Sequence, residues 1–239
     1  MIPASTGQDK KPERISGMFN AIAPSYDFLN HVLTIGIDRL WRKKAIAALE
    51  LKDCDVLLDV CTGTGDMALE ARKASNASLV VGVDFASAML KRGLDKVKGA
   101  GESKKIFLIN GDATRLPLCN ESVDATAIAF GIRNVEHPDK ACQEMARTLR
   151  PGGKLAILEF MEPRIFGLAV LYSWYFKYLL PLIGRTLSGH KGAYSYLPAS
   201  VSAFLTPEEF IQLLERSGFK NLQAIPLTFG IVCLYTATR

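Results

Sequence analysis

A glycine-containing turn follows one of the apolar stretches of the sequence and could bind a cofactor. Residues 56–60 read VLLDV, and Gly63 and Gly65 come shortly after them and before a helical pattern. Glycine lets a ligand approach the backbone closely, and the free amides at a helix N-terminus attract anionic groups. A tight connection between a strand and a helix would explain the same glycines, so this turn alone leaves both interpretations open.

Two acidic residues farther along the chain favour the cofactor interpretation. Asp84 ends the second apolar stretch, about 20 residues beyond the turn, where a carboxylate accepts hydrogen bonds from ribose hydroxyls. Asp84 could instead cap the next helix, although Ser87 is well placed for that role. Asp112 ends the third stretch, and its carboxylate and the Ala113 amide could meet the amino group and a ring nitrogen of an adenine. Because the carboxyl ends of parallel strands meet at one crevice, we predict a single cofactor site there.

A regular alternation of apolar and helical patterns connects these turns. Strands are predicted over residues 56–60, 79–83, 106–109, 123–130 and 154–160, and helices over residues 66–73, 87–98 and 138–149. Such alternation is typical of parallel strands joined by right-handed crossovers. The central part of the chain is therefore predicted to form a doubly wound α/β sheet.

The C-terminal part predicts a helix and two closing strands. Residues 206–209 read TPEE, a capping box with proline at the first helical position, and Gly218 closes that helix. Residues 222–225 and 231–236 predict an antiparallel pair joined by a short loop with Gly230. This closing pair suits the Rossmann-like fold of class I S-adenosylmethionine-dependent methyltransferases, with a mostly parallel seven-stranded sheet.

The N-terminal part adds helices outside this sheet. Helical spacing over residues 15–23 and 37–49 predicts a cap on the domain. We expect an N-terminal extension and helical cap over residues 1–50, and one methyltransferase domain over residues 51–239 with an insertion at 161–205.

The residue patterns also indicate which cofactor to expect. Ala68 stands where a dinucleotide-binding Gly-x-Gly-x-x-Gly motif has its third glycine, which that motif can tolerate, but no Tyr-x-x-x-Lys pair for hydride transfer occurs. The closing strand pair and the Gly-Asp-Ala turn favour S-adenosylmethionine. The five cysteines form no Cys-x-x-Cys motif and do not cluster with the three histidines, so no metal site is predicted.

Longer segments carry a resemblance that covers nearly the whole chain, from about residue 19 to residue 239. They read FNAIAPSYDFLNHVLTIGIDRLWRK, LLDVCTGTGD, VGVDFASAML, NGDATRLPL, FGIRNVEHPDKA, LRPGGKLAILEF, LPLIG, YSYLPASV and LTFGIVCLYTATR. The sequence resembles the ubiquinone/menaquinone biosynthesis C-methyltransferases, for which FGIRN, YDFLN and YSYLP are narrow signals. Ala129 stands where many members have serine, which removes a polar contact near the cofactor. Asp112 stands where many have asparagine, which preserves an acceptor.

The resemblance implies site residues at the matching positions. The implied cofactor contacts are Asp59, Gly63, Thr64, Gly65, Asp84, Phe85, Asp112 and Ala113. The implied catalytic residues are Arg133, Asn134, Tyr26 and Asp27, and weaker candidates are Tyr194, Tyr196 and His190. A surface salt bridge would also explain Arg133, and a structural turn would also explain Tyr26 and Asp27.

The reaction implied by the resemblance is methyl transfer from S-adenosylmethionine to a ring carbon of a polyprenyl quinol. The acceptor would be demethylmenaquinol, the equivalent benzoquinol of ubiquinone biosynthesis, or both. A ring carbon becomes nucleophilic when the neighbouring hydroxyl, with a pKa near 10, loses its proton. Arg133 is a poor base because it stays charged, but it could stabilise the phenolate or orient a water or carboxylate that takes the proton.

Charge and hydropathy limit the kinds of partner that the protein is expected to bind. The 239 residues carry a net charge of +5 and are 49% hydrophobic, which suits a globular protein. The densest basic run is Arg39, Arg42, Lys43 and Lys44. This run is too short to predict nucleic-acid binding. It would be explained by a solvated helix face or by contact with an anionic membrane surface. Reduced cysteines and an N-terminus without an apolar stretch favour the cytoplasm.

The segment 165–183 is apolar and rich in aromatic residues, but it contains Lys177 and Pro181. Because it falls inside the predicted domain, we expect it to guide a prenyl tail, to dock on the inner face of the membrane, or to pack as an ordinary helix. Homo-oligomerisation is left open by the sequence.

Other functions remain to be weighed against this one. A methyltransferase for RNA or protein amines would often carry Asn/Asp-Pro-Pro-aromatic after the fourth strand, where this chain has FGIRN. A methyltransferase for another small aromatic acceptor, or a cofactor-binding scaffold subunit without activity in a quinone-synthesis complex, would keep the same turns.

Overall fold

The computed structural model describes residues 11–24, 26–27, 30, 34, 36–74, 77, 79–161 and 191–239, apart from the side chains of residues 191–195. The apolar segment 165–183, most of the insertion expected at 161–205, and the side chains of His190 and Tyr194 lie outside the described residues. In the described part of the chain, no helix is both long enough and apolar enough to cross a lipid bilayer.

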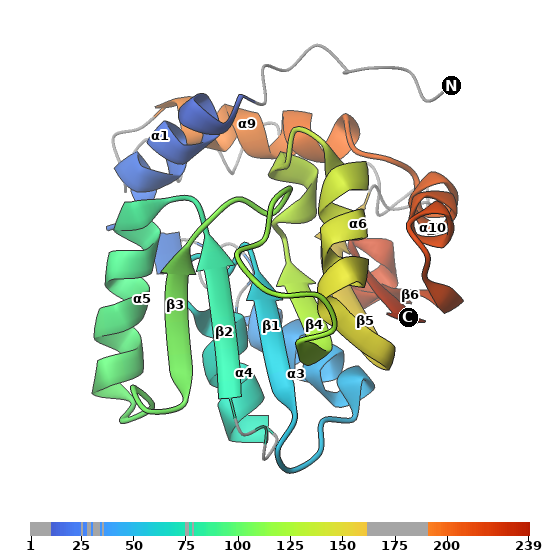
Figure 1. The fold of residues 1–239 in the computed structure, drawn as a ribbon. Helices are drawn as coiled ribbons and strands as arrows, with labels where there is room; N and C mark the ends of the chain where they lie inside the picture. The colour runs from blue at the N-terminus through green and yellow to red at the C-terminus, as the bar shows by residue number, and fades with distance from the viewer. Residues whose placement is uncertain are drawn as a thin grey trace.

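Seven strands form one sheet in the order β3-β2-β1-β4-β5-β7-β6 (Figure 1). Their bounds are β1 (Val56–Val60), β2 (Leu79–Asp84), β3 (Ile106–Asn110), β4 (Val123–Ala129), β5 (Leu149–Phe160), β6 (Lys220–Leu227) and β7 (Val232–Thr238). Strands β3, β2, β1, β4 and β5 pair in parallel, whereas β7 runs antiparallel to both β5 and β6. The doubly wound sheet with a closing antiparallel pair is therefore confirmed.

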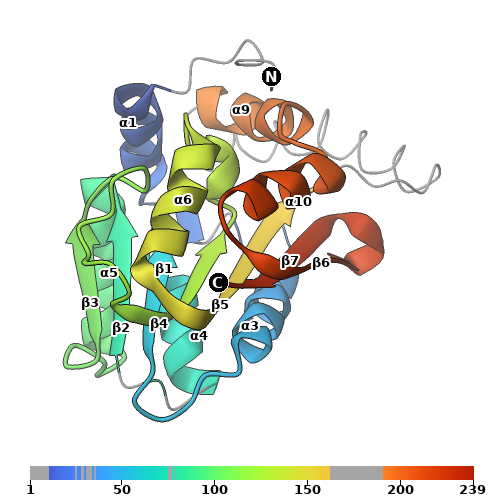
Figure 2. The same cartoon turned by 45° about the vertical axis from the view of Figure 1, so that its right-hand side comes forward.

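Helices cover both faces of this sheet (Figures 1 and 2). Their bounds are α1 (Pro12–Ile22), α3 (Ile37–Leu49), α4 (Asp66–Ala74), α5 (Ser87–Gly99), α6 (Pro138–Thr148), α9 (Lys191–Ser202) and α10 (Pro207–Arg216), with the short helices η1 (Ile132–Asn134) and η3 (Thr228–Gly230). Helices α3, α4 and α5 pack on one face, and α6 and α10 pack on the other. Such a two-faced cover is expected when parallel strands are joined by helical crossovers.

The central strands are apolar on both faces because both faces are covered. Leu57 packs with the α3 and α4 side chains, while the next residue, Leu58, packs with those of α6 and α10. Both leucines are fully buried. Side chains alternate between the faces of a strand, so continuous apolar runs such as VLLDV mark strands that are buried on both sides.

Among the strands, β5 and β6 differ most from their predicted bounds. Strand β5 begins at Leu149 rather than at residue 154, and its pairing with β4 shifts register between Val123 and Ala125. The sequence Pro-Gly-Gly at 151–153 suggests a turn, but here it forms an irregular strand, with Gly152 at φ +76°. Strand β6 spans Lys220–Leu227 and so extends beyond the predicted 222–225 at both ends.

The start and end of α10 agree with the sequence pattern. The Thr206 hydroxyl accepts from the Glu209 amide, and the Glu209 carboxylate accepts from the Thr206 amide at 2.8 Å, which completes the capping box. Gly218 follows the helix with φ +96°.

Two helices lie across the carboxyl end of the parallel strands. Helix α1 contacts both α5 and α9, and both views show α1 and α9 beyond the strand tips (Figures 1 and 2). The tips of the parallel strands therefore lie beneath a helical layer.

Candidate active site

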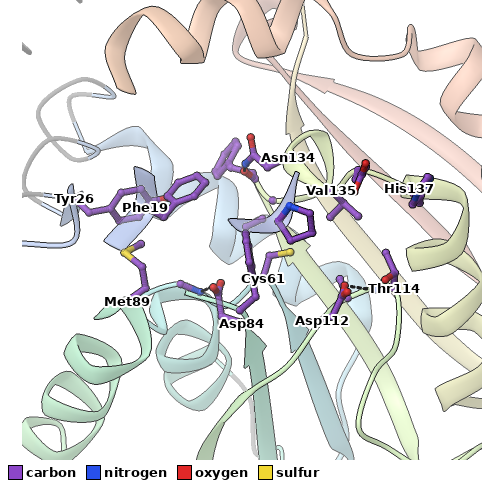
Figure 3. Close-up of a pocket in the computed structure, with 18 residues that line it drawn as sticks. Phe19, Tyr26, Cys61, Asp84, Met89, Asp112, Thr114, Asn134, Val135 and His137 are labelled. Atoms are coloured by element: carbon purple, nitrogen blue, oxygen red, sulfur yellow. Dashed lines mark hydrogen bonds between the residues drawn. The ribbon is translucent and has the colours of Figure 1, made fainter. Parts of the chain in front are cut away.

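A cavity of about 280 Å³ lies at the carboxyl end of the sheet, under α1 (Figure 3). Seven of the predicted site residues line it: Tyr26, Gly63, Asp84, Phe85, Asp112, Ala113 and Asn134. Its remaining lining residues are Pro12, Phe19, Cys61, Met89, Thr114, Ala129, Phe130, Gly131, Val135, Glu136 and His137. The volume is near the lower end of the range for small-molecule sites, roughly 300–1,000 Å³.

The turn between β1 and α4 forms the floor of this cavity. Gly63 and Gly65 have φ values of +57° and +81°, and Cys61 also adopts a left-handed conformation, with φ +54°. The Thr62 amide donates to the Val83 carbonyl at 3.1 Å, which fixes the turn against β2. Gly63 lines the cavity, whereas Gly65 only shapes the chain as it enters α4.

Asp84 connects this turn to the start of α5. One carboxylate oxygen accepts from the Gly63 amide and the other from the Ala86 amide, each at 2.8 Å. The residue is only 7% exposed, and this burial raises the pKa of its carboxyl group. Ser87, which is well placed in the sequence to cap α5, is its first helical residue; Ala86 is the N-cap residue, and the Asp84 carboxylate accepts from its amide.

Asp112 lies on the far side of the cavity, at the carboxyl end of β3 (Figure 3). One of its carboxylate oxygens accepts from the Thr114 amide at 2.8 Å, and the residue is exposed. Ala113, which follows it, is buried in the cavity wall. The tips of β1, β2 and β3 are thus brought together as predicted.

Asp59 does not line the cavity, although the resemblance implied that it contacts the cofactor. It is 1% exposed, and the Thr62 hydroxyl donates to it at 2.5 Å. Burial raises the pKa of its carboxyl group to about 7, and the Thr62 bond and the positive charge of Arg42 partly oppose this rise. In this position Asp59 supports the turn from behind.

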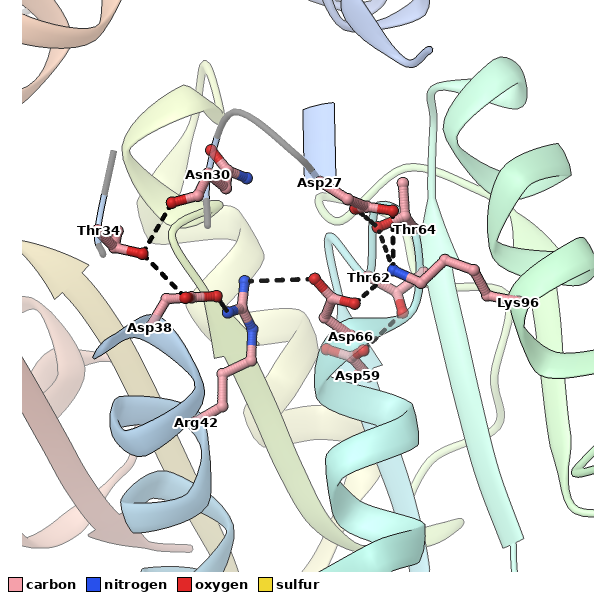
Figure 4. A network of polar contacts seen from close by, with 10 residues as sticks. All are labelled: Asp27, Asn30, Thr34, Asp38, Arg42, Asp59, Thr62, Thr64, Asp66 and Lys96. Atoms are coloured by element: carbon pink, nitrogen blue, oxygen red, sulfur yellow. Dashed lines mark hydrogen bonds and ion pairs between the residues drawn. The ribbon is translucent and has the colours of Figure 1, made fainter. Parts of the chain in front are cut away.

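Thr64 and Asp27 also lie away from the cavity, in a polar network under the N-terminal cap (Figure 4). The Thr64 hydroxyl donates to Asp27, and Lys96 on α5 bonds Asp27 and Thr64 at 3.0 and 3.1 Å. Lys96 also pairs with Asp66, which lies 3.9 Å from Arg42. This network joins the N-terminal cap to the glycine turn and to α5. Sequence patterns missed Lys96, because nothing local marks a lysine on an amphipathic helix as a partner for residues far away.

Arg133 lies behind the cavity wall and forms a buried ion pair, not the surface salt bridge that was its alternative. The side chain is 7% exposed, and its Nη1 donates to Glu159 at 2.6 Å and to the Phe130 carbonyl at 2.7 Å. Its Nε donates to Ser200 on α9 at 3.3 Å, and the guanidinium lies 5.5 Å from the Phe160 ring. Glu159 was missed from the sequence, although it is an acid at the carboxyl end of a strand, as Asp84 is.

Asn134 reaches the cavity and is held from two sides. Its amide nitrogen donates to the Phe130 carbonyl at 3.3 Å, and its amide oxygen accepts from the Tyr196 hydroxyl on α9 at 3.0 Å. Burial raises the pKa of Tyr196, so the phenol stays neutral and can donate. Tyr196 was only a weak candidate from the sequence, and the structure connects it directly to a cavity residue.

An aromatic and apolar wall faces these polar groups (Figure 3). Phe19 and Tyr26 meet edge to face with their ring centroids 6.1 Å apart, and Met89 lies beside them. Burial raises the pKa of Tyr26, so its hydroxyl remains protonated near neutral pH. A hydrogen bond with Asn30 only partly opposes this rise, so Tyr26 is a poor base there.

Comparison with known proteins places this site in a family. The sequence profile of the ubiE/COQ5 methyltransferase family matches residues 7–239. A demethylmenaquinone methyltransferase of Bacteroides fragilis is 43% identical over all of this chain and 97% of its own length. The ubiquinone/menaquinone biosynthesis C-methyltransferase UbiE of Geobacter sulfurreducens is 43% identical over 96% of this chain and 90% of its own.

Solved structures agree in fold. A SAM-dependent methyltransferase of Thermotoga maritima, a possible histamine N-methyltransferase, has a TM-score of 0.65 with 18% identity, covering 94% of this chain and 99% of its own. The [4+2]-cyclase SpnF has a TM-score of 0.72 with 15% identity, covering 99% of each chain. Since these two proteins differ in the reaction that their names state, the fold does not settle the chemistry. The profile match over residues 7–239 and the relatives do settle the lineage: the chain belongs to the ubiE/COQ5 methyltransferase family.

Proposed function

We propose that this protein methylates a ring carbon of a polyprenyl quinol with S-adenosylmethionine as the donor. The observation that carries the proposal is the meeting of Gly63, Asp84 and Asp112 around one cavity in a chain of this family. The proposed acceptor is demethylmenaquinol, the corresponding benzoquinol, or both, because one relative is named a demethylmenaquinone methyltransferase and another a ubiquinone/menaquinone biosynthesis C-methyltransferase.

The polar groups of the cavity fit an adenosyl group. A carboxylate offers about four acceptor positions. The amides of Gly63 and Ala86 occupy two positions on Asp84, which leaves its two oxygens able to accept from ribose hydroxyls. The Thr114 backbone amide donates to one oxygen of Asp112, and the second oxygen is proposed to accept from an adenine amino group.

The bound cofactor supplies a methyl group that is already activated on a sulfonium. The task of the protein is therefore to hold the acceptor carbon close to that methyl group and to favour the ionised quinol. Asn134 and Tyr26 line the cavity and are assigned to contact the acceptor. Arg133 is assigned a positioning role, because it orients the Phe130–Asn134 segment from behind the wall.

The network of Asp27, Thr64 and Lys96 is assigned to hold the N-terminal cap over the cofactor. Thr64 and Asp59 then act by shaping the glycine turn, and Phe85 covers the cavity beside Asp84. Helix α1 suits the proposed N-terminal cap because it lies across the strand tips, whereas α3 packs on the sheet together with α4 and shares its core, so the proposed boundary near residue 50 does not separate two folding units.

A polyprenyl quinol is dissolved in the membrane, so an enzyme that methylates it must reach it at the membrane surface. We propose a protein of the cytoplasm that touches the inner face of the membrane without crossing it. Neither nucleic acid nor a metal ion has a role in the proposed reaction, and self-association is a question for sedimentation measurements.

The direct test is an assay with purified protein, labelled S-adenosylmethionine and short-tailed quinols. A naphthoquinol or benzoquinol product one methyl heavier supports the proposal and identifies the acceptor. The matched variants are Asp84→Asn, expected to bind the donor at least about tenfold more weakly, and Asp95→Asn, which changes an exposed acid on α5 and is expected to behave as wild type.

Three outcomes of this assay contradict the proposal. Donor binding without methylation of either quinol favours a scaffold subunit. Methylation of another aromatic compound alone assigns a different acceptor. Equal donor binding by Asp84→Asn and wild type removes the proposed cofactor site.

A further inference from the structure

The loop between β6 and β7 presents an exposed aromatic side chain on an unusual backbone. Phe229 is 72% exposed, and Thr228, Phe229 and Gly230 have φ values of +47°, +57° and +84°. Left-handed conformations are costly for residues with a β-carbon and persist where the surrounding structure enforces them. An exposed phenylalanine held in this way is a candidate for contact with something outside the chain.

Helix α3 carries further exposed apolar residues among basic ones. Ile37 and Leu40 are 37% and 54% exposed. Arg39, Lys43 and Lys44 are exposed on the same helix, whereas Arg42 is buried and pairs with Asp38. The basic run of the sequence therefore divides into one internal arginine and three outward cations beside Leu40.

One hydrogen bond joins α3 to the β6–β7 loop. The Trp41 indole nitrogen donates to the Thr228 hydroxyl at 2.8 Å. Leu40 and Phe229 are the chain neighbours of these two residues, so both exposed side chains lie at the same junction. We call Ile37, Leu40 and Phe229, together with the three exposed cations of α3, the α3–η3 surface.

The α3–η3 surface lies beside the candidate active site. Val232 pairs with Phe160, which places η3 at the carboxyl end of β5, the same end of the sheet as the cavity. The Trp41 ring lies 6.0 Å from the ring of Phe130, which lines the cavity. A single buried indole thus separates the surface junction from the cavity wall.

We propose that the α3–η3 surface docks on an anionic lipid bilayer. Apolar side chains that protrude among lysines and arginines match the layered chemistry of a bilayer, with acyl chains below anionic headgroups. A protein partner or a second copy of this chain would instead have to bring acidic residues to these cations, and both occupants are outcomes of the test below. The use of such docking for a lipid acceptor rests on the proposed function, but the docking itself does not.

Vesicle flotation tests this proposal on the full-length protein. The probes are vesicles of phosphatidylcholine with and without phosphatidylglycerol. The double variant Leu40→Ser/Phe229→Ser is compared with Leu94→Ser/Phe107→Ser, which removes a leucine and a phenylalanine of 52% and 47% exposure from α5 and β3. The charge variant Lys43→Gln/Lys44→Gln is compared with Lys91→Gln/Lys98→Gln, which removes two exposed lysines from α5.

We expect wild type to bind the anionic vesicles, with binding that weakens as salt increases. Each α3–η3 variant should lower the partition coefficient roughly tenfold, and each α5 or β3 control should leave it within about twofold. All variants keep residues 162–190, so binding by that segment would be common to them. Equal partitioning of the test and control variants, or loss of a dimer in sedimentation without any vesicle binding, overturns the proposal.

Activity distinguishes this proposal from the proposed function. With a short-tailed, water-soluble quinol, the α3–η3 variants should turn over as wild type does, because the substituted side chains lie outside the cavity. With a long-tailed quinol in anionic vesicles, their rate should fall about as far as their binding. If methylation is absent for every variant and wild type alike, the proposed function fails while the flotation result still decides the docking.

Discussion

Arg133→Ala removes the cation that pairs with the buried Glu159 carboxylate. Glu159 is fully buried, and Arg133 is the cation within 2.6 Å of it. Breaking a buried ion pair by removing one partner costs about 3–5 kcal/mol, because an uncompensated charge stays in the interior. Small domains have about 5–15 kcal/mol of total stability, so this variant should lie near the limit of folding. Low activity of Arg133→Ala alone would therefore say little about catalysis.

The double variant Arg133→Met/Glu159→Gln separates the structural role from the functional one. It replaces both charges by neutral groups of similar size. The Phe160 amide donates to Glu159 at 2.9 Å, and the side-chain amide oxygen introduced by Glu159→Gln can still accept that bond. Neutral replacement of a whole buried pair is often close to neutral in stability. We expect the double variant to recover most of the loss seen for Arg133→Ala in urea unfolding.

Quinol turnover should stay low in this double variant even though its stability recovers. Without the guanidinium, the segment that carries Asn134 loses the Arg133 bonds to Ser200 and to the Phe130 carbonyl, and only the longer Asn134 bond to that carbonyl, at 3.3 Å, remains. We expect quinol turnover at least about tenfold below wild type, whereas S-adenosylmethionine affinity should stay near the wild-type value, because Arg133 does not line the cavity. Wild-type turnover in the double variant would refute the positioning role. Wild-type stability of Arg133→Ala would refute the buried pair.

Three further predictions follow from other parts of the site. Burial raises the pKa of Asp59 to about 7, so the stability of wild type relative to Asp59→Asn should fall as the pH rises from about 4 to 7, by at most about 1.4 kcal/mol per pH unit. If urea unfolding gives the same pH dependence of the unfolding free energy for both proteins, the shift is contradicted. Lys96→Met should release S-adenosylmethionine several-fold faster in stopped-flow experiments, because Lys96 bonds Asp27 of the N-terminal cap at 3.0 Å. Lys98→Met is the control, and equal release rates for the two variants would show that the cap does not depend on the bond between Lys96 and Asp27. Tyr196→Phe removes the hydrogen bond to Asn134 and should raise the KM for the quinol a few-fold without changing donor affinity, and an unchanged KM would remove Tyr196 from the acceptor site.

The sheet and the cofactor side of the site could be predicted because their signals are local. Apolar runs that end in a glycine or an acid place Gly63, Asp84 and Asp112 at neighbouring strand tips once the strands are parallel. The capping box at Thr206 is equally local and was confirmed. Each of these features depends on residues that are close together in the chain.

The contacts between distant segments could not be predicted in the same way. Glu159 and Arg133 are 26 positions apart, and Lys96 and Asp27 are 69 positions apart. Family resemblance marked Thr64 as a cofactor contact, but whether a side chain turns toward a cavity or toward a neighbouring helix depends on packing, and here it meets Asp27. The start of β5 was misplaced for a related reason, since pairing with β4 overrides the turn preference of Pro-Gly-Gly.

Calorimetric titration of S-adenosylmethionine into wild type and Asp84→Asn tests the central claim most directly. If the three strand tips form the donor site, wild type should bind one equivalent, and the variant should bind about tenfold more weakly or more, because a hydrogen bond to a charged group contributes about 1.5–3 kcal/mol. The absence of any binding heat in wild type over a range of temperatures, or identical affinities for the two proteins, would contradict the account.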